Sequence, residues 1–258
     1  MAYSEEALAE IDDKYRQLNH THNELLLQLM SFQQRLKNEK AKEYLMQGVG
    51  RRLKTLSRCI NNIFTIFPSD RSEHLSKEEL SDVNINLHAF FINIAGVFDN
   101  LGWVFVYENE LLGKANEGKI ARNGVGLFCT ETQSYLTREL RDYLNSNSIK
   151  TWNADYSKNY RDSLAHRIPL YVPPSLLNDA EAQVFRDREQ QIQKLDFTKE
   201  ADREKYDELH EAQQKLGRVS HFLAHSLNEG SRPVYFHAQV LADFATIEEV
   251  IHKFIKHF

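Results

Sequence analysis

Apolar residues recur at helical spacing along most of this chain. The first two stripes have apolar positions three and four residues apart, the spacing that places them on one face of a helix. They are Leu18, His22, Leu25, Leu29, Phe32 and Leu36, then Leu53, Leu56, Ile60, Ile63 and Phe67. Pro68 ends the second stripe, because proline cannot continue the hydrogen-bond ladder. We expect an N-terminal helical hairpin over residues 1–75, with His22 within its packing seam.

A strongly apolar central helix is predicted next. Ser76 and Glu79 have the spacing of a capping box, and the apolar run continues to about Leu112, before Gly113. Polar residues interrupt this run, so no stretch reaches the roughly 18 apolar residues of a membrane span. We expect the interrupting side chains, among them Asn93, Asp99 and Asn100, to bond to the helix that ends before Pro169 or to line a cleft beside it.

The second half of the chain predicts further helices around one charged segment. A loop over 113–129 precedes a helix capped by Thr130 and Gln133, and another helix runs from about Asn153 to the residues before Pro169. Two more apolar stripes predict C-terminal helices within 175–258: Leu209, Leu216, Val219, Leu223 and Leu227, then Leu241, Phe244, Ile247, Ile251, Phe254 and Phe258. The stretch 179–200 is rich in charge and Gln and is predicted to be an insertion. The fold class is all-α, as a single helical domain over 1–258.

Composition excludes several classes of protein. The net charge of -5 argues against a surface coated in basic residues for sequence-independent duplex binding. The basic cluster Arg51, Arg52, Lys54 and Arg58 is predicted to be the outer face of an amphipathic helix. Two cysteines cannot make a disulfide framework, and no apolar leader follows the acidic start, so a cytoplasmic location is expected.

The main chemical signal lies at the end of the helix before Pro169, where Arg161, Asp162 and His166 follow one another closely. The arginine fork binds phosphate oxygens, and histidine exchanges protons near neutral pH, so the pair suffices for RNA cleavage by the 2′-hydroxyl without metal. Asp162 can orient either group. Residues five apart are rotated by about 140° on an ideal helix and rise by roughly 7.5 Å, so a shared site needs a loosened last turn or a second subunit.

These residues resemble the Arg, polar residue, short spacer and His motif of HEPN domains, and the resemblance covers roughly 79–172. The preceding helix, with the sequence FDNLGW at 98–103, is similar to the helix before the motif in bacterial HEPN-like proteins. The resemblance implies a helical bundle that dimerises and acts as a metal-independent endoribonuclease in toxin-antitoxin or defence systems. It implies Arg161 and His166 as the catalytic pair with Asp162 between them, RNA as substrate, an antitoxin or other protein as partner, and no cofactor. Further candidates for RNA contact are Arg167, Tyr160 and Asn100.

Two alternatives stay open. His221 and His225, four residues apart, would share one helix face, with His210 or His88 as a third metal ligand. The histidines at 210, 221 and 225 fall opposite the leucine stripe, however, which favours a solvated face. The other alternative is a non-catalytic HEPN-like dimeric scaffold that binds a protein through its flanking helices.

Overall fold

The structure is a computed structural model that describes residues 3–114, 117–224 and 233–258. The described chain is mostly helical, which confirms the predicted all-α class. Its α-helices are α1 (Glu5–Arg35), α2 (Glu39–Glu43), α3 (Arg51–Ile66), α4 (Lys77–Glu108), α5 (Thr130–Gln133), α6 (Arg138–Leu144), α7 (Asn147–Thr151), α8 (Lys158–His166), α9 (Asp179–Ile192), α10 (Glu200–Gln214) and α11 (Phe236–His257). The tighter or wider turns are the π-helical η1 (Tyr44–Gly50) and η4 (Trp152–Ser157) and the 3₁₀ turn η3 (Arg122–Gly124). Two antiparallel strand pairs join β1 (Ser175–Leu176) to β2 (Arg218–Val219) and β3 (Phe222–Leu223) to β4 (Val234–Tyr235).

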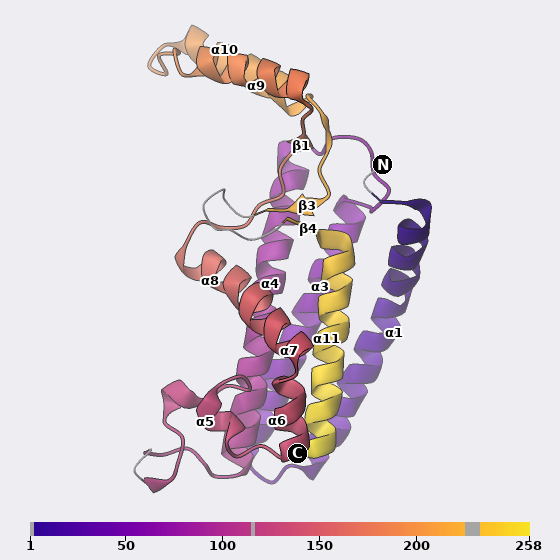
Figure 1. Cartoon of the computed structure of the whole chain (residues 1–258), viewed down its shortest axis with the longest axis vertical. Coiled ribbons are helices and arrows are strands. Elements are labelled where there is room, and N and C mark those ends of the chain that lie inside the picture. The colour runs from indigo at the N-terminus through magenta and orange to yellow at the C-terminus, as the bar shows by residue number, and fades with distance from the viewer. Residues whose placement is uncertain (1–2, 115–116, 225–232) are drawn as a thin grey trace.

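Four long helices form the body of the molecule. α3 packs along α4, while α1 contacts both α3 and α11 (Figure 1). The apolar stripes predicted for α1, α3 and α11 are buried in this bundle, apart from a few residues at its edges such as the half-buried His22 and Phe258. Burial of these stripes, at roughly 25 cal/mol per Å² of apolar surface, is the main force that holds the helices together.

The central helix α4 begins where the sequence predicts and ends earlier. Ser76 and Glu79 form the capping box in both directions. The helix ends at Glu108, four residues before the predicted end, because Glu110 has a φ of 52° and Leu112 pairs instead with Ile120. By length and composition α4 could cross a membrane, and 61% of its most apolar window is buried inside the bundle.

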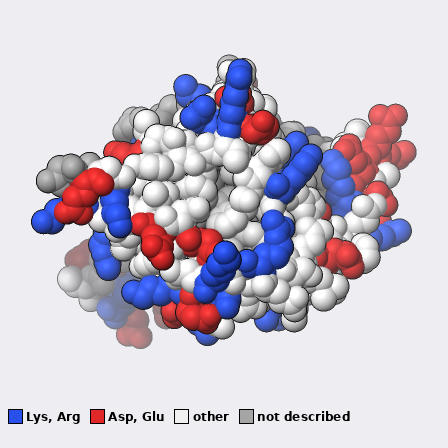
Figure 2. Space-filling view, turned by 90° about the horizontal axis from the view of Figure 1, so that it is seen from below, with Lys and Arg blue, Asp and Glu red and all other residues white. Residues whose placement is uncertain are grey.

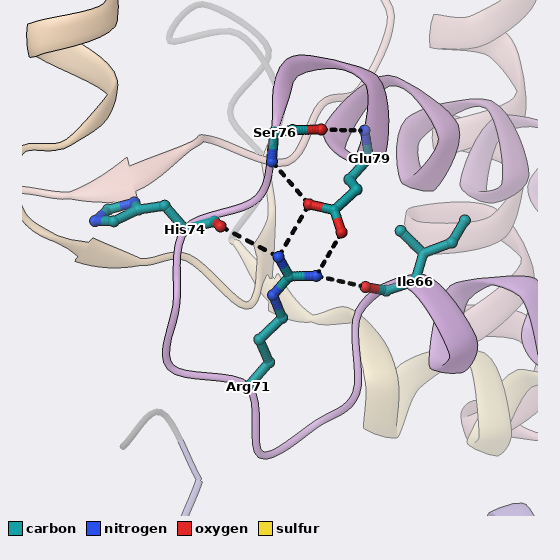
Figure 3. Close-up of polar contacts among 5 residues, drawn as sticks. All are labelled: Ile66, Arg71, His74, Ser76 and Glu79. Carbon is teal, nitrogen blue, oxygen red and sulfur yellow. Dashed lines mark hydrogen bonds and ion pairs between the residues drawn. The ribbon is translucent and has the colours of Figure 1, made fainter.

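Arg71 fixes the connection between α3 and α4 (Figure 3). Its guanidinium donates to both carboxylate oxygens of Glu79 at 2.9 Å and to the backbone oxygens of Ile66 and His74. Because Glu79 also accepts from the backbone N–H of Ser76, one carboxylate holds the start of α4 and the preceding loop together.

Three predicted helices in the second half need correction. The segment from Thr130 is broken after one turn into α5 and α6, and the helix expected from Asn153 begins at Asn147 instead. The helix predicted to carry Leu209 through Leu227 ends at Gln214, while Val219 and Leu223 lie in strands and Leu227 is outside the described residues. Gly217 explains the break, since its φ is +76° and a Cβ there would lie 2.4 Å from the backbone oxygen of Leu176.

The charged segment forms a helical hairpin, α9 and α10, that projects from the bundle (Figure 1). No residue of α9 is buried, which agrees with an excursion from the core. Residues 179–214 contain 11 of the 37 acidic and six of the 32 basic residues, so the hairpin alone carries a net charge of -5. The rest of the chain is therefore neutral overall.

Candidate functional site

The helix that carries Arg161 is anchored by a buried carboxylate on α11. α7, η4 and α8 follow one another without a break, and Asp243 accepts hydrogen bonds from the Trp152 indole and the Tyr156 hydroxyl, both at 2.8 Å. Gln239 donates a third bond at 2.8 Å. Asp243 is 0% exposed, and burial raises its pKa from 3.8 to about 6, although the three donors oppose this rise. The anchor fixes which face of α8 points inward.

Tyr160 and Ser163 form the buried face of α8. Tyr160 is 2% exposed, and its ring lies edge-on to Phe91 at 5.0 Å and tilted against Tyr156 at 4.4 Å. The predicted RNA contact by Tyr160 is therefore corrected: this side chain packs the core and offers no surface to a ligand.

Arg161 lines a cavity between α8, α4 and the loop that follows η3. The cavity has a volume of about 190 Å³, and its wall includes Asp99, Cys129 and Lys158. The Arg161 Nε atom lies 3.1 Å from Asp162 Oδ1, an ion pair whose angle is too poor for a hydrogen bond. The two side chains are 37% and 31% exposed. No described residue accepts a hydrogen bond from this guanidinium, and its Nε is buried without a hydrogen-bond partner.

Asp99 is the carboxylate of this cavity. Burial by the cavity walls raises its pKa, and the positive charges of Arg161 and Arg52 oppose the rise. Asp99 is nevertheless exposed at the surface, so water screens these effects.

The polar residues that interrupt the apolar run of α4 bind Arg52 of α3. Its Nε donates to Asn100 Oδ1 and its Nη1 to Asn93 Oδ1, both at 2.9 Å. Arg52 lies across Gly96, where an added Cβ would be 2.2 Å from the guanidinium carbon. The two asparagines were expected to bond to the helix that carries Arg161 or to line its cleft, and they bond to α3 instead. Asn100, a candidate RNA contact, is thus already bonded to Arg52. Arg52 is half-buried rather than part of an outer face, whereas Arg51, Lys54 and Arg58 are exposed as predicted.

His166 is exposed as the last residue of α8 and does not line the cavity. α8 remains regular to its end, where the Arg167 backbone N–H donates to the Ser163 oxygen at 3.0 Å. The loosened last turn that would bring His166 toward Arg161 is therefore absent from this helix. Arg167, another candidate RNA contact, is exposed and donates through Nη2 to Asn159 Oδ1 at 2.6 Å.

The proposed histidine metal site does not form among the described residues. His210 lies on α10 with its ring stacked on Tyr206, whereas His221 lies in the segment between β2 and β3, so they do not share a helix face. His225 lies outside the described residues. His88, the other suggested ligand, bonds to the Leu170 backbone oxygen at 2.6 Å.

His221 is 2% exposed and belongs to the wall of a separate cavity of about 300 Å³ near the N-terminus. Burial lowers its pKa, and nearby backbone carbonyls such as that of Val219 oppose this, but none of them makes a hydrogen bond with the ring. His221 is thus a buried histidine packed among Tyr3, Phe67 and His237.

Lys158, Cys129 and Asp243 were missed by reasoning from the sequence. Asp243 had a usable signal, since it is a single acidic residue inside the apolar stripe of α11. Lys158 lies one turn before Arg161 on the same helix, so its position in the cavity follows from the spacing. No sequence pattern pointed to Cys129, because it reaches the cavity through the packing of a loop.

Among the described residues, the cavity brings together two cations, Arg161 and Lys158, with one carboxylate, Asp99. Such a set can bind a phosphate through the arginine fork, while Asp99 and Asp162 limit the positive potential. Within one chain, no histidine is among the described residues that line this cavity. No protein-family model matches this chain, and no curated protein or solved structure matches it either.

Proposed function

We propose that this protein is a metal-independent endoribonuclease of HEPN type, acting as a homodimer. Arg161 binds the scissile phosphate, and His166 transfers protons. The 2′-oxygen attacks phosphorus after losing its proton to His166, the bond to the 5′-oxygen breaks, and the protonated His166 returns a proton to that leaving oxygen. The products are a 2′,3′-cyclic phosphate and a free 5′-hydroxyl.

One observation carries the proposal: the Arg161 guanidinium makes no hydrogen bond to a described residue although it lines a cavity. An arginine held for structure alone is expected to be bonded on several of its donors, as Arg71 is. The exposed His166 on the same helix supplies the group that transfers protons.

Two further features support the proposal. The net negative charge of the chain opposes RNA binding, but all of it lies on the projecting hairpin. The body that carries Arg161 is therefore neutral overall. Because Arg161 and His166 occupy different faces of α8, a second copy related by a two-fold axis would place His166 of one chain near Arg161 of the other.

The test is cleavage of a mixed single-stranded RNA in EDTA, with product ends mapped. We expect cyclic phosphate ends from the native chain and loss of cleavage in His166→Ala and Arg161→Ala. His20→Ala removes another exposed histidine, on α1, and should leave cleavage unchanged. Intact RNA with the native chain, or equal cleavage by all variants, would overturn the proposal.

Mixing tests the composite site. Equal amounts of Arg161→Ala and His166→Ala chains, unfolded and refolded together, should recover up to about a quarter of native activity, since half of the dimers are mixed and each has one intact site. No recovery would place both groups in one chain.

A non-catalytic dimeric scaffold is the second candidate. The ion pair of Arg161 with Asp162 and the projecting acidic hairpin favour it, because both fit a protein-binding role without chemistry. It predicts dimers with intact RNA in every assay.

A further inference from the structure

Three aromatic side chains gather where α4 nears its end. Trp103 and Tyr107 are four residues apart on α4 and so share one face, and Tyr44 at the start of η1 lies beside them. The Trp103 and Tyr107 rings are stacked with centroids 5.3 Å apart, and Tyr44 lies 5.6 Å from Trp103 and 5.3 Å from Tyr107. We call these three rings the aromatic patch.

Two cations border the aromatic patch. The Lys40 Nζ atom lies 5.4 Å from the centre of the Tyr107 ring, and the Arg122 guanidinium carbon lies 6.0 Å from that of Trp103. Both cations belong to exposed residues, and neither forms an ion pair with a carboxylate of a described residue. At these distances the cation–π attraction is near its outer limit, so either side chain can turn away to meet a ligand.

The rings of the aromatic patch are only half-buried. Their neighbours on α4 behave differently: Phe98 and Phe105 are 3% and 8% exposed and belong to the core. At the lower end of the bundle, Lys and Arg side chains border a broad uncharged surface, with Asp and Glu among them (Figure 2). Flat rings beside cations suit a ligand that has both a π-face and negative charge.

The aromatic patch continues from the Arg161 cavity. Trp103 follows Asp99, a wall residue of the cavity, by one turn of α4, a rise of about 6 Å. The loop after α4 also reaches both places, since Arg122 lies over Trp103 while Gly126 and Cys129 line the cavity.

We propose that the aromatic patch stacks an unpaired base of single-stranded RNA while Lys40 and Arg122 contact the adjoining phosphates. This inference rests on the proposed function, which it deepens by naming the form of RNA that the surface accepts. Unpaired bases expose the π-faces that aromatic side chains bind, whereas a duplex hides them in its own stack. The patch selects single strands without reading their sequence, because every base has a π-face.

The test uses tryptophan fluorescence, since the chain has two tryptophans, Trp103 and Trp152. His166→Ala protein is titrated with a ten-nucleotide oligoadenylate, so that cleavage does not interfere. Stacking should quench the emission, and the quenching should persist in Trp152→Phe but disappear in Trp103→Phe. Trp103→Ala should weaken binding by about tenfold or more, with its fold checked by circular dichroism.

A matched control lies on the acidic hairpin, where Phe197 packs edge-on against Tyr206 at 5.4 Å. Phe197 is 51% exposed, and Phe197→Ala should leave binding unchanged. Heparin, a polyanion without bases, and a duplex of the same length should not quench Trp103.

Equal quenching by heparin, unchanged affinity in Trp103→Ala, or no binding of the oligonucleotide would each overturn the stacking site. Cleavage that survives such a result would leave the proposed function standing without the aromatic patch. If RNA quenches the fluorescence but the native chain does not cleave RNA, the aromatic patch stands and the proposed function fails. The protein would then bind single strands without cutting them.

Discussion

Trp152 donates its indole N–H to the fully buried carboxylate of Asp243 over 2.8 Å, and this bond ties the helix of the candidate site to the last helix of the bundle. The carboxylate accepts three bonds, all from neutral donors, so no positive charge compensates its burial. Its raised pKa is the consequence.

Asp243 should make the protein less stable at neutral pH than at mildly acidic pH. Between the usual pKa of 3.8 and the folded value of about 6, the folded carboxyl holds a proton that the unfolded chain has released. The unfolded state then binds fewer protons, so stability falls as pH rises through this window, by on the order of 3 kcal/mol, and is flat above it. Buried histidines with lowered pKa values, such as His237 at about 3, oppose this slope, so the comparison must be between variants.

Asp243→Asn isolates the effect. Its amide oxygen can accept from Trp152 and Gln239 while its nitrogen donates to the Tyr156 oxygen, so the bonds remain and the charge is lost. We expect urea unfolding to show a more stable variant at pH 7.5 and equal stability at pH 4. Asp82→Asn, at an exposed position on α4, should show no such difference. Equal unfolding of Asp243→Asn and the native chain at both pH values would contradict the assigned pKa.

Gly102 should be intolerant of any side chain. A Cβ at this position would lie 2.5 Å from the Cα of Gly126, and backbone cannot move aside as a flexible side chain can. We expect Gly102→Ala to cost about 1–3 kcal/mol and to push the loop that carries Cys129 away from α4. Gly50 is the matched control, because its backbone is helical and an added Cβ would meet only ordinary contact at 3.8 Å. Gly50→Ala should stabilise by about 0.5–1 kcal/mol, and equal effects of the two substitutions on urea unfolding would refute the close approach.

The extent to which this fold follows from sequence depends on what ends each element. Local signals were sufficient for α1, α3 and the start of α4, since an apolar stripe, Pro68 and the Ser76 capping box act within a few residues. They failed after α10, where the leucine spacing continues through Gly217 but its left-handed φ stops the helix. Glycine allows a left-handed φ but does not require it, so Gly217 alone did not predict a helix end. The leucine spacing therefore predicted, wrongly, that the helix continues.

The candidate site, too, could be predicted only in part from the sequence. The order of Arg161, Asp162 and His166 on one helix follows from the sequence, and so does their failure to share a face. The cavity does not, because Asp99 and Cys129 reach it through the packing of α4 and the loop against α8. Tyr160 shows that a residue next to a motif need not face the site. Arg161 lines the cavity, whereas Tyr160, rotated by about 100° on the same helix, packs in the core.

The bond between Arg71 and Glu79 should make the start of α4 sensitive to acid. The hydrogen bonds from Arg71 and from the Ser76 backbone lower the pKa of Glu79 below its usual 4.5. Its contribution to stability is therefore complete above about pH 4.5 and is lost as pH falls through the lower folded value. We expect Glu79→Gln to cost about 1 kcal/mol at pH 7, and the cost should shrink as the pH falls below 4.5, measured by urea unfolding, because acid then neutralises the native group. Exposed Glu78→Gln should have no effect at either pH, and a Glu79→Gln deficit that is independent of pH would show that the charge is not involved.

Cys129 reports on the charges of the candidate site, because thiolate is the form that reacts with iodoacetamide. Burial raises its pKa, Asp99 and Glu131 raise it further, and Lys158 opposes them. Asp99→Asn should therefore speed alkylation of Cys129 at pH 8, and Lys158→Gln should slow it, with the modified peptide followed by mass spectrometry. Cys59 is the internal reference, since burial raises its pKa to about 11 and it should stay unmodified while the chain is folded. If both variants change the alkylation rate in the same direction, local opening of the fold governs the reactivity of the thiol, and not the opposed charges of Asp99 and Lys158. Opposite changes would place both groups around Cys129 in solution.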